Sequence, residues 1–224
     1  ALMTSDTRFK NKTFSAETPM EYLRNYAAAV EQTLLRVNPE NLSAAVKCLT
    51  DATQSGRRIY VCGNGGSASI ADHLCCDWSK GSQVDGVRPL KTYSLTSNNA
   101  LLTAIANDYG YEKTFSTQIN LFGEAGDILV AISSSGNSPN IIEAVQHARQ
   151  RGLKVIGLSG FSGGKLAELA DISLHTPFDN YGIVEEDNES QRAWAEAFVL
   201  REMSAMASRI DSPPMRAVAE RRQG

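Results

Sequence analysis

A run of hydroxyl side chains beside a glycine is the part of this sequence best suited to chemistry. Four serines lie within six positions, at Ser133, Ser134, Ser135 and Ser138, and Pro139 follows the last of them. Serine before proline is typical of a helix N-cap followed by the first helical position. The free N–H groups of a helix N-terminus attract anions, and serine hydroxyls can donate further hydrogen bonds. The spacing predicts a site for a phosphate monoester, and a capped helix after an ordinary polar turn is the simpler alternative.

A second glycine-rich turn follows the first apolar run. The string GNGGS, residues 63–67, matches the dinucleotide fingerprint GxGxxG only loosely, and no acidic residue ends a second strand to bind a ribose. The glycine–lysine pattern of a nucleotide-binding P-loop is also absent. We therefore expect Asn64, Gly65 and Gly66 to close on a sugar rather than on a nicotinamide cofactor or ATP.

Three further polar groups are candidates for acid/base or metal chemistry. His73 and Asp77 are four residues apart, so one helix face carries both, and they could bind a divalent metal or form an acid/base pair. An ordinary surface pair is the simpler alternative. Asn107 and Asp108 end another predicted helix and are either turn residues or groups that face the site. Glu185 opens a cluster of acids at the start of the final helix, where acids also complement the helix dipole.

Apolar runs alternate with helical patterns about five times, which predicts a doubly wound α/β domain with a parallel five-stranded sheet of flavodoxin- or Rossmann-like type. Both candidate loops follow the carboxyl ends of strands, where such sheets bind ligands. Two extra N-terminal helices could pack on a neighbouring subunit or cover their own sheet. The expected strands are residues 57–62, 91–95, 128–132, 153–158 and 172–175, and the extra helices are residues 19–37 and 42–55.

The bulk composition narrows the class of protein. The chain of 224 residues is 42% hydrophobic with a formal net charge of -3, so it gives no electrostatic reason to expect nucleic acid or anionic lipid as a partner. It has no apolar run long enough to span a bilayer and no signal-peptide core at its start, so we expect a cytoplasmic protein. We expect an N-terminal arm at 1–17, a single domain at 18–210 and a mobile tail at 211–224.

Four strings together resemble the sugar isomerase (SIS) domain family, most closely its sedoheptulose 7-phosphate isomerase (phosphoheptose isomerase) group. They are GNGGSASIADH, TAIANDYG, AISSSGNSPNIIEAV and LSGFSGGK. The resemblance implies isomerisation of sedoheptulose 7-phosphate, or a similar long-chain ketose phosphate, through an enediol in heptose biosynthesis. It also implies a homotetramer whose sites lie between subunits. The serines would hold the phosphate, and the sugar would be lined by Asn64, Gly65, Gly66, Asn107 and Asp108.

The same resemblance implies zinc, with His73, Asp77 and Glu185 as ligands, and Asp77 with Glu185 as the catalytic pair. His73 matches a ligand histidine of the family, whereas Asp77 stands where the family has a glutamate. The final helix contains no histidine, and Asn188 and Ala193 stand where the family has histidines.

These departures keep two other functions open. Glu185 or Glu189 could fill the gap left by the missing histidines. Alternatively, the chain could be a non-catalytic phosphosugar-binding protein, or an interaction protein of the DnaA-initiator-associating type, which has the same fold. A phosphosugar-sensing module is the weakest alternative, because no DNA-binding domain is attached.

Overall fold

The computed structural model describes residues 16–81, 83, 85, 89–180, 183–185, 187, 188, 201, 204 and 205. The predicted arm up to residue 15, the predicted tail at 211–224 and most of the predicted final helix lie outside these residues. The described residues of the final helix are all helical, at 183–185, 187, 188, 201, 204 and 205. None of the helices in the described part of the chain is long and apolar enough to cross a membrane.

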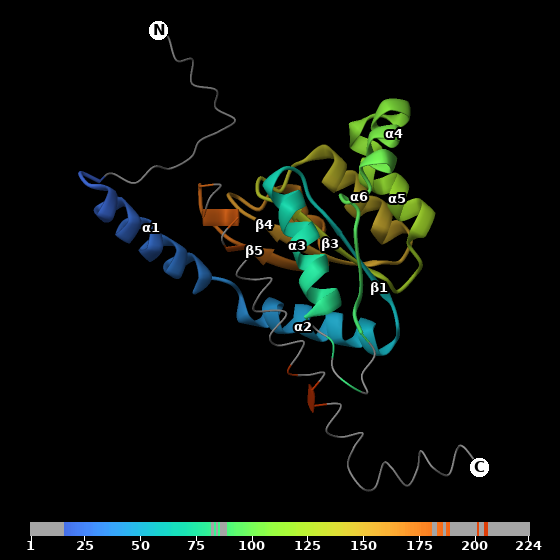
Figure 1. The fold of residues 1–224 in the computed structure, drawn as a ribbon, viewed down its shortest axis with the longest axis horizontal. Helices are drawn as coiled ribbons and strands as arrows, with labels where there is room; N and C mark the ends of the chain where they lie inside the picture. Colours follow the sequence, from blue (N-terminus) through green and yellow to red (C-terminus); the bar gives the residue numbers. More distant parts are fainter. Residues whose placement is uncertain are drawn as a thin grey trace, which may run out of the picture.

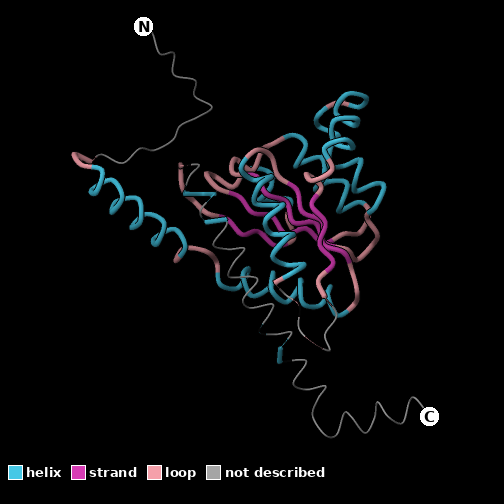
Figure 2. The backbone as a smooth tube through the Cα atoms, viewed as in Figure 1, coloured by secondary structure: helices cyan, strands magenta, loops and turns pink. Residues whose placement is uncertain are grey.

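A parallel sheet forms the centre of the molecule (Figure 2). Its five strands follow the order β2-β1-β3-β4-β5. This doubly wound order confirms the predicted fold class. The ladder pairs run in register, so that Ser133, Ser159 and His175 lie side by side at the carboxyl ends of three neighbouring strands. The strands are β1 (Arg58–Cys62), β2 (Lys91–Ser94), β3 (Ile128–Ser133), β4 (Lys154–Ser159) and β5 (Ile172–His175).

Helices cover both faces of the sheet (Figure 1). Because successive strand residues point to opposite faces, Ile59 and Val61 pack in one core with the second and third helices, whereas Tyr60 and Cys62 pack in the other core. β3 is buried at all six positions, as expected for a strand covered on both sides. The helices are α1 (Pro19–Leu34), α2 (Pro39–Gln54), α3 (Gly66–Lys80), α4 (Asn99–Tyr109), the 3-10 turn η1 (Tyr111–Lys113), α5 (Thr114–Phe122), α6 (Pro139–Gln150) and α7 (Gly164–Leu169).

The two N-terminal helices behave differently. α2 packs on the sheet of its own chain through residues such as Ala45 and Leu49. α1 extends away from the body of the molecule (Figure 1) and buries only Ala29 and Thr33. Its apolar side chains include Leu23, which is 58% exposed. The sequence predicted that these helices either cover their own sheet or pack on a neighbouring subunit. α2 covers its own sheet, whereas α1 does not.

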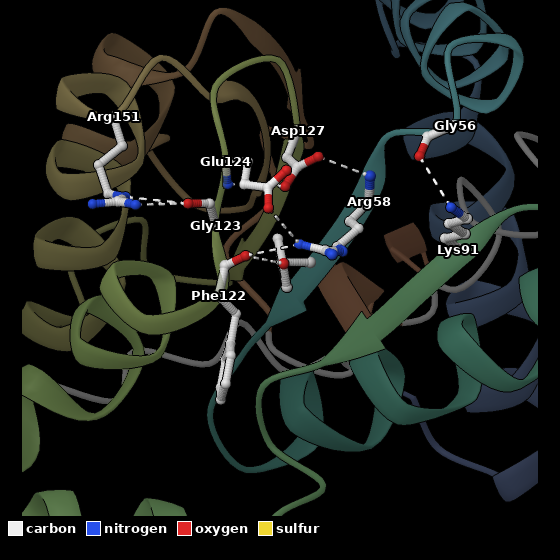
Figure 3. Close-up of polar contacts among 9 residues, drawn as sticks. Gly56, Arg58, Lys91, Phe122, Gly123, Glu124, Asp127 and Arg151 are labelled. Atoms are coloured by element: carbon white, nitrogen blue, oxygen red, sulfur yellow. Dashed lines mark hydrogen bonds and ion pairs between the residues drawn. The ribbon is translucent and has the colours of Figure 1, made fainter.

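Asp127 ties together the amino ends of two central strands (Figure 3). Its carboxylate accepts the backbone N–H of Arg58 at 2.9 Å and that of Glu124 at 3.0 Å, and the side chain is 2% exposed. Replacing Asp127 with alanine leaves both N–H groups without a charged acceptor. We expect the free energy of unfolding in urea to fall by about 2–4 kcal/mol. The exposed Asp179 provides the control, Asp179→Ala, and a loss below about 1 kcal/mol for Asp127→Ala would contradict this role.

Candidate functional site

A cavity of about 190 Å³ lies at the carboxyl end of β3. It brings together the serine loop, the glycine turn after β1 and a carboxylate from the helical segment after β5. All the residues in its wall except one are polar. The wall consists of Asn64, Ser67, Ile132, Ser133, Ser134, Ser135, Ser138 and Glu185.

The serine loop presents its hydroxyls to this cavity. Ser138 is the N-cap of α6 and Pro139 opens the helix, as predicted. The Ser138 hydroxyl does not cap the helix N–H groups; it lies 3.1 Å from the Ser133 hydroxyl instead. Ser133 and Ser134 are almost fully buried. Buried hydroxyls beside a helix N-terminus suit an anion such as a phosphate.

A neighbouring loop holds the serine loop in place. The carbonyl of Gly136 accepts the N–H of Leu166 at 2.9 Å, and the side chain of Asn137 accepts the N–H of Lys165 at 3.1 Å. Gly136 has a φ of +66°, and a Cβ there would lie 1.9 Å from the carbonyl oxygen of Gly163. Only glycine allows this close approach of the two loops.

The glycine turn leaves room for the Glu185 carboxylate at the start of α3. A Cβ on Gly66 would lie 2.5 Å from Oε1 of Glu185, so the side chain of Glu185 rests directly on this glycine. Burial raises the pKa of the Glu185 carboxyl above its ordinary value. The structure therefore places a carboxyl group that is partly shielded from solvent beside the serines, where it could transfer a proton to or from a ligand.

Sequence reasoning missed Ser67 as a lining residue. Its side chain is 4% exposed and faces the cavity from the first turn of α3. The signal was present, because Ser67 follows the glycines directly in the string GNGGS. The sequence predicted Ile132 as a buried strand residue. It also lines the cavity, because it lies one residue before the end of β3.

His73 and Asp77 lie apart from this cavity. They form a pair on α3 with 3.3 Å between Nε2 and Oδ2, and their side chains are 53% and 30% exposed. Among the described residues, no three histidine, cysteine, aspartate or glutamate side chains lie close enough together to hold a metal ion. A catalytic zinc ion uses three protein ligands, so the described residues of one chain do not fit a zinc centre.

Other predicted residues also lie outside the cavity wall. Asn107 and Asp108 are exposed at the end of α4, where the Asn107 amide donates to Asp108 Oδ1 at 2.8 Å. Asn188 is fully buried, and neither of its amide atoms has a hydrogen-bond partner within the described chain. Ala193 and Glu189 lie outside the described residues. The sugar-lining role of Asn107 and Asp108 remains a prediction.

The fold and the cavity define a doubly wound α/β protein with a hydroxyl-lined pocket at the carboxyl edge of its sheet. Residues 21–160 match the model of the SIS domain. Phosphoheptose isomerase from Rhodospirillum rubrum is 42% identical over 136 residues, which cover 61% of this chain and 72% of the relative. The chain belongs to the SIS domain family.

Solved structures are similar over most of the chain. The structure of phosphoheptose isomerase from Neisseria gonorrhoeae is 32% identical, with a TM-score of 0.73, and the match covers 79% of this chain and 95% of that chain. A phosphoheptose isomerase from Francisella tularensis is 31% identical, with a TM-score of 0.75, over 80% of this chain and 95% of that chain.

Proposed function

We propose that this protein is an aldose–ketose isomerase that acts on sedoheptulose 7-phosphate, or a similar long-chain ketose phosphate, in heptose biosynthesis. The observation that carries the proposal is the cavity whose wall contains four serines and Glu185. The relatives named phosphoheptose isomerase, at up to 42% identity, support the choice of substrate.

The chemistry requires a phosphate anchor, a base and a donor to oxygen. The hydroxyls at 133–135 and 138 and the N-terminus of α6 would hold the phosphate. A carboxylate would take the proton from C1 of the ketose and return it to C2 of the enediol, while donors stabilise the charge on oxygen. Glu185 lies in the cavity wall and is the first candidate for this proton transfer. Asp77 lies outside this cavity, so its proposed role as the partner of Glu185 requires Asp77 of another copy of the chain.

We further propose that the site is completed by another copy of the chain in a homotetramer. The exposure of α1 and of the pair His73 and Asp77 supports this arrangement. Asn107, Asp108 and the backbone of Gly65 and Gly66 would then line the sugar from both sides of the interface. For zinc, the pair His73 and Asp77 would likewise have to come from one copy and Glu185 from another, and no step above depends on the metal.

Proton NMR in D₂O tests the isomerase directly. We expect the full chain with sedoheptulose 7-phosphate to form an aldose phosphate with deuterium at C2, because an enediol exchanges its proton with solvent. Parallel samples with added zinc or with a chelator measure the dependence on metal. Absence of both product and exchange under all three conditions would contradict the isomerase.

The missing histidines favour one alternative, a non-catalytic phosphosugar-binding or interaction protein. Asn188 cannot act as a general acid or base, and its side chain is buried. Broadened substrate resonances without product or exchange would support this alternative, because the phosphate pocket would then be intact and the catalytic pair would not.

A further inference from the structure

A network of side chains around Asn64 connects the glycine turn after β1, the 3-10 turn η1 and the first residues of α5 and α6. The amides of Asn64 and Asn140 bind each other reciprocally, with Asn64 Nδ2 donating to Asn140 Oδ1 at 2.8 Å and Asn140 Nδ2 donating to Asn64 Oδ1 at 2.9 Å. The hydroxyl of Tyr111 donates to Asn64 Oδ1 at 3.0 Å. Asn140 is 1% exposed and Thr114 is fully buried, whereas Tyr111 is 55% exposed, so the network runs from the interior of the protein to its surface.

The hydroxyl of Thr114 determines which amide atoms of this network donate and which accept. An amide can be turned so that oxygen and nitrogen exchange places, so the pair alone has two possible polarities. The hydroxyl of Thr114 donates to the backbone carbonyl of Tyr111 at 2.8 Å, and a carbonyl can only accept. Thr114 Oγ1 is therefore left as an acceptor, and Asn140 must present Nδ2 to it, at 3.4 Å.

This choice determines the orientation of Asn64. Since Asn140 turns Nδ2 toward Thr114, its Oδ1 faces Asn64. Asn64 must then donate a hydrogen bond from its own Nδ2 to that oxygen. Asn64 Oδ1 then accepts from both Asn140 and Tyr111, so both of its lone pairs are used. One Nδ2 hydrogen of Asn64 remains without an acceptor among the described residues, and Asn64 lines the cavity.

We infer that Asn140, Thr114 and Tyr111 are positioning residues that hold Asn64 as a hydrogen-bond donor toward an oxygen of the ligand. That oxygen is one that carries negative charge, such as a carbonyl oxygen that becomes an enediolate; its identity rests on the proposed function. A donor that is already oriented stabilises such an oxygen without reorganisation, whereas a reversed Asn64 would direct its own oxygen at the charge.

The first test replaces Asn140 with aspartate, which keeps the shape but cannot donate to Asn64. We expect kcat for sedoheptulose 7-phosphate to fall about 10–100-fold with KM changed less than about 3-fold. In an Asn64→Ala background the same change should cost less than about 3-fold, because a positioning residue has no effect without the group it positions. Equal losses in both backgrounds would overturn the inference.

Asn41→Asp is the matched control for that variant. Asn41 is half-buried on α2, and its amide donates to the carbonyl of Ser173 at 2.9 Å, away from the cavity. We expect this control to alter thermal stability without altering kcat.

The second test removes the Thr114 hydroxyl, which determines the orientation of the two amides. Thr114→Val keeps the volume of a fully buried side chain but deletes its hydroxyl, and we expect kcat to fall about 3–10-fold. Thr50→Val is the control, because Thr50 is also buried and its hydroxyl has no hydrogen-bond partner in the described part of the chain. Equal kcat values for the two variants would overturn the role of Thr114.

Neutron diffraction from the wild-type protein separates this inference from the proposed function, because it locates deuterium without any turnover. We expect deuterium on Thr114 Oγ1 toward the Tyr111 carbonyl and on the Tyr111 hydroxyl toward Asn64. The opposite polarity overturns the inference even if the protein is an active isomerase. The expected polarity in a protein that does not isomerise the substrate overturns the proposed function and leaves the orientation of Asn64 standing.

Discussion

Replacing Glu185 with glutamine is expected to lower kcat for isomerisation by about 10²–10⁴-fold, the usual contribution of a positioned acid or base. Glutamine has nearly the same size and keeps the contact with Gly66, so the cavity should retain its shape. We expect the KM for the sugar phosphate to stay the same or to decrease, because the variant removes a negative charge from the cavity that would hold the phosphate. Steady-state kinetics with sedoheptulose 7-phosphate measure both constants.

The same variant should be more stable than the wild type at neutral pH. Burial raises the pKa of Glu185 above 4.5, so the folded state resists its ionisation. Well below pH 4.5 the carboxyl is protonated in both the folded and the unfolded protein, so its burial does not lower the stability. Stability is then lost as the pH rises through the raised folded pKa. In metal-free buffer we expect Glu185→Gln to melt on the order of 1–2 °C higher at pH 7 and at the same temperature near pH 4.

The exposed Glu168 provides the matched control, Glu168→Gln, which should change neither kcat nor the dependence of Tm on pH. A loss of activity in Glu185→Gln accompanied by a lower Tm at every pH would indicate a structural role for this carboxyl and would contradict the proposed one. Activity unchanged within about 3-fold would exclude Glu185 as the acid or base.

Gly136→Ala should lower both the stability of the fold and the affinity for the sugar phosphate. The residue has a φ of +66°, which costs an L-residue about 1–2 kcal/mol, and its new Cβ would overlap the carbonyl oxygen of Gly163. Relief of that overlap must move the backbone of one loop, which adds about 1–3 kcal/mol. We expect a total loss of about 3 kcal/mol in urea unfolding, and a KM raised at least about 10-fold because the serines shift.

Gly152→Ala separates the two contributions. Gly152 has a φ of +78°, but a Cβ there would meet its nearest neighbour, the Cβ of Ala125, at 3.4 Å, an ordinary contact. This control should lose only about 1–2 kcal/mol and keep its KM. Equal losses of stability in the two variants would show that the contact between Gly136 and Gly163 has no special cost.

Local pattern was sufficient to predict the doubly wound sheet and the serine loop. The apolar run at 128–132 is bounded by turn residues, and both its burial and the helix start after Ser138 depend on residues close in the chain. The glycine turn after β1 followed from the same kind of signal, as did the placement of both loops at the carboxyl edge of a parallel sheet. Helix ends shifted by a few residues because caps and frayed turns are decided by local competition.

Only the tertiary structure decided which of the polar candidates meet. Glu185 lines the cavity with the serines, whereas His73 and Asp77 do not. The rotation of α3 about its axis decides this, and it depends on how the apolar face of α3 packs on the sheet. The pairing of Asn64 with Asn140, 76 residues apart, depends on β1 and β3 being parallel neighbours in the sheet. Such contacts are set by strand order and helix packing, which no local periodicity encodes, and they are the contacts that orient the site.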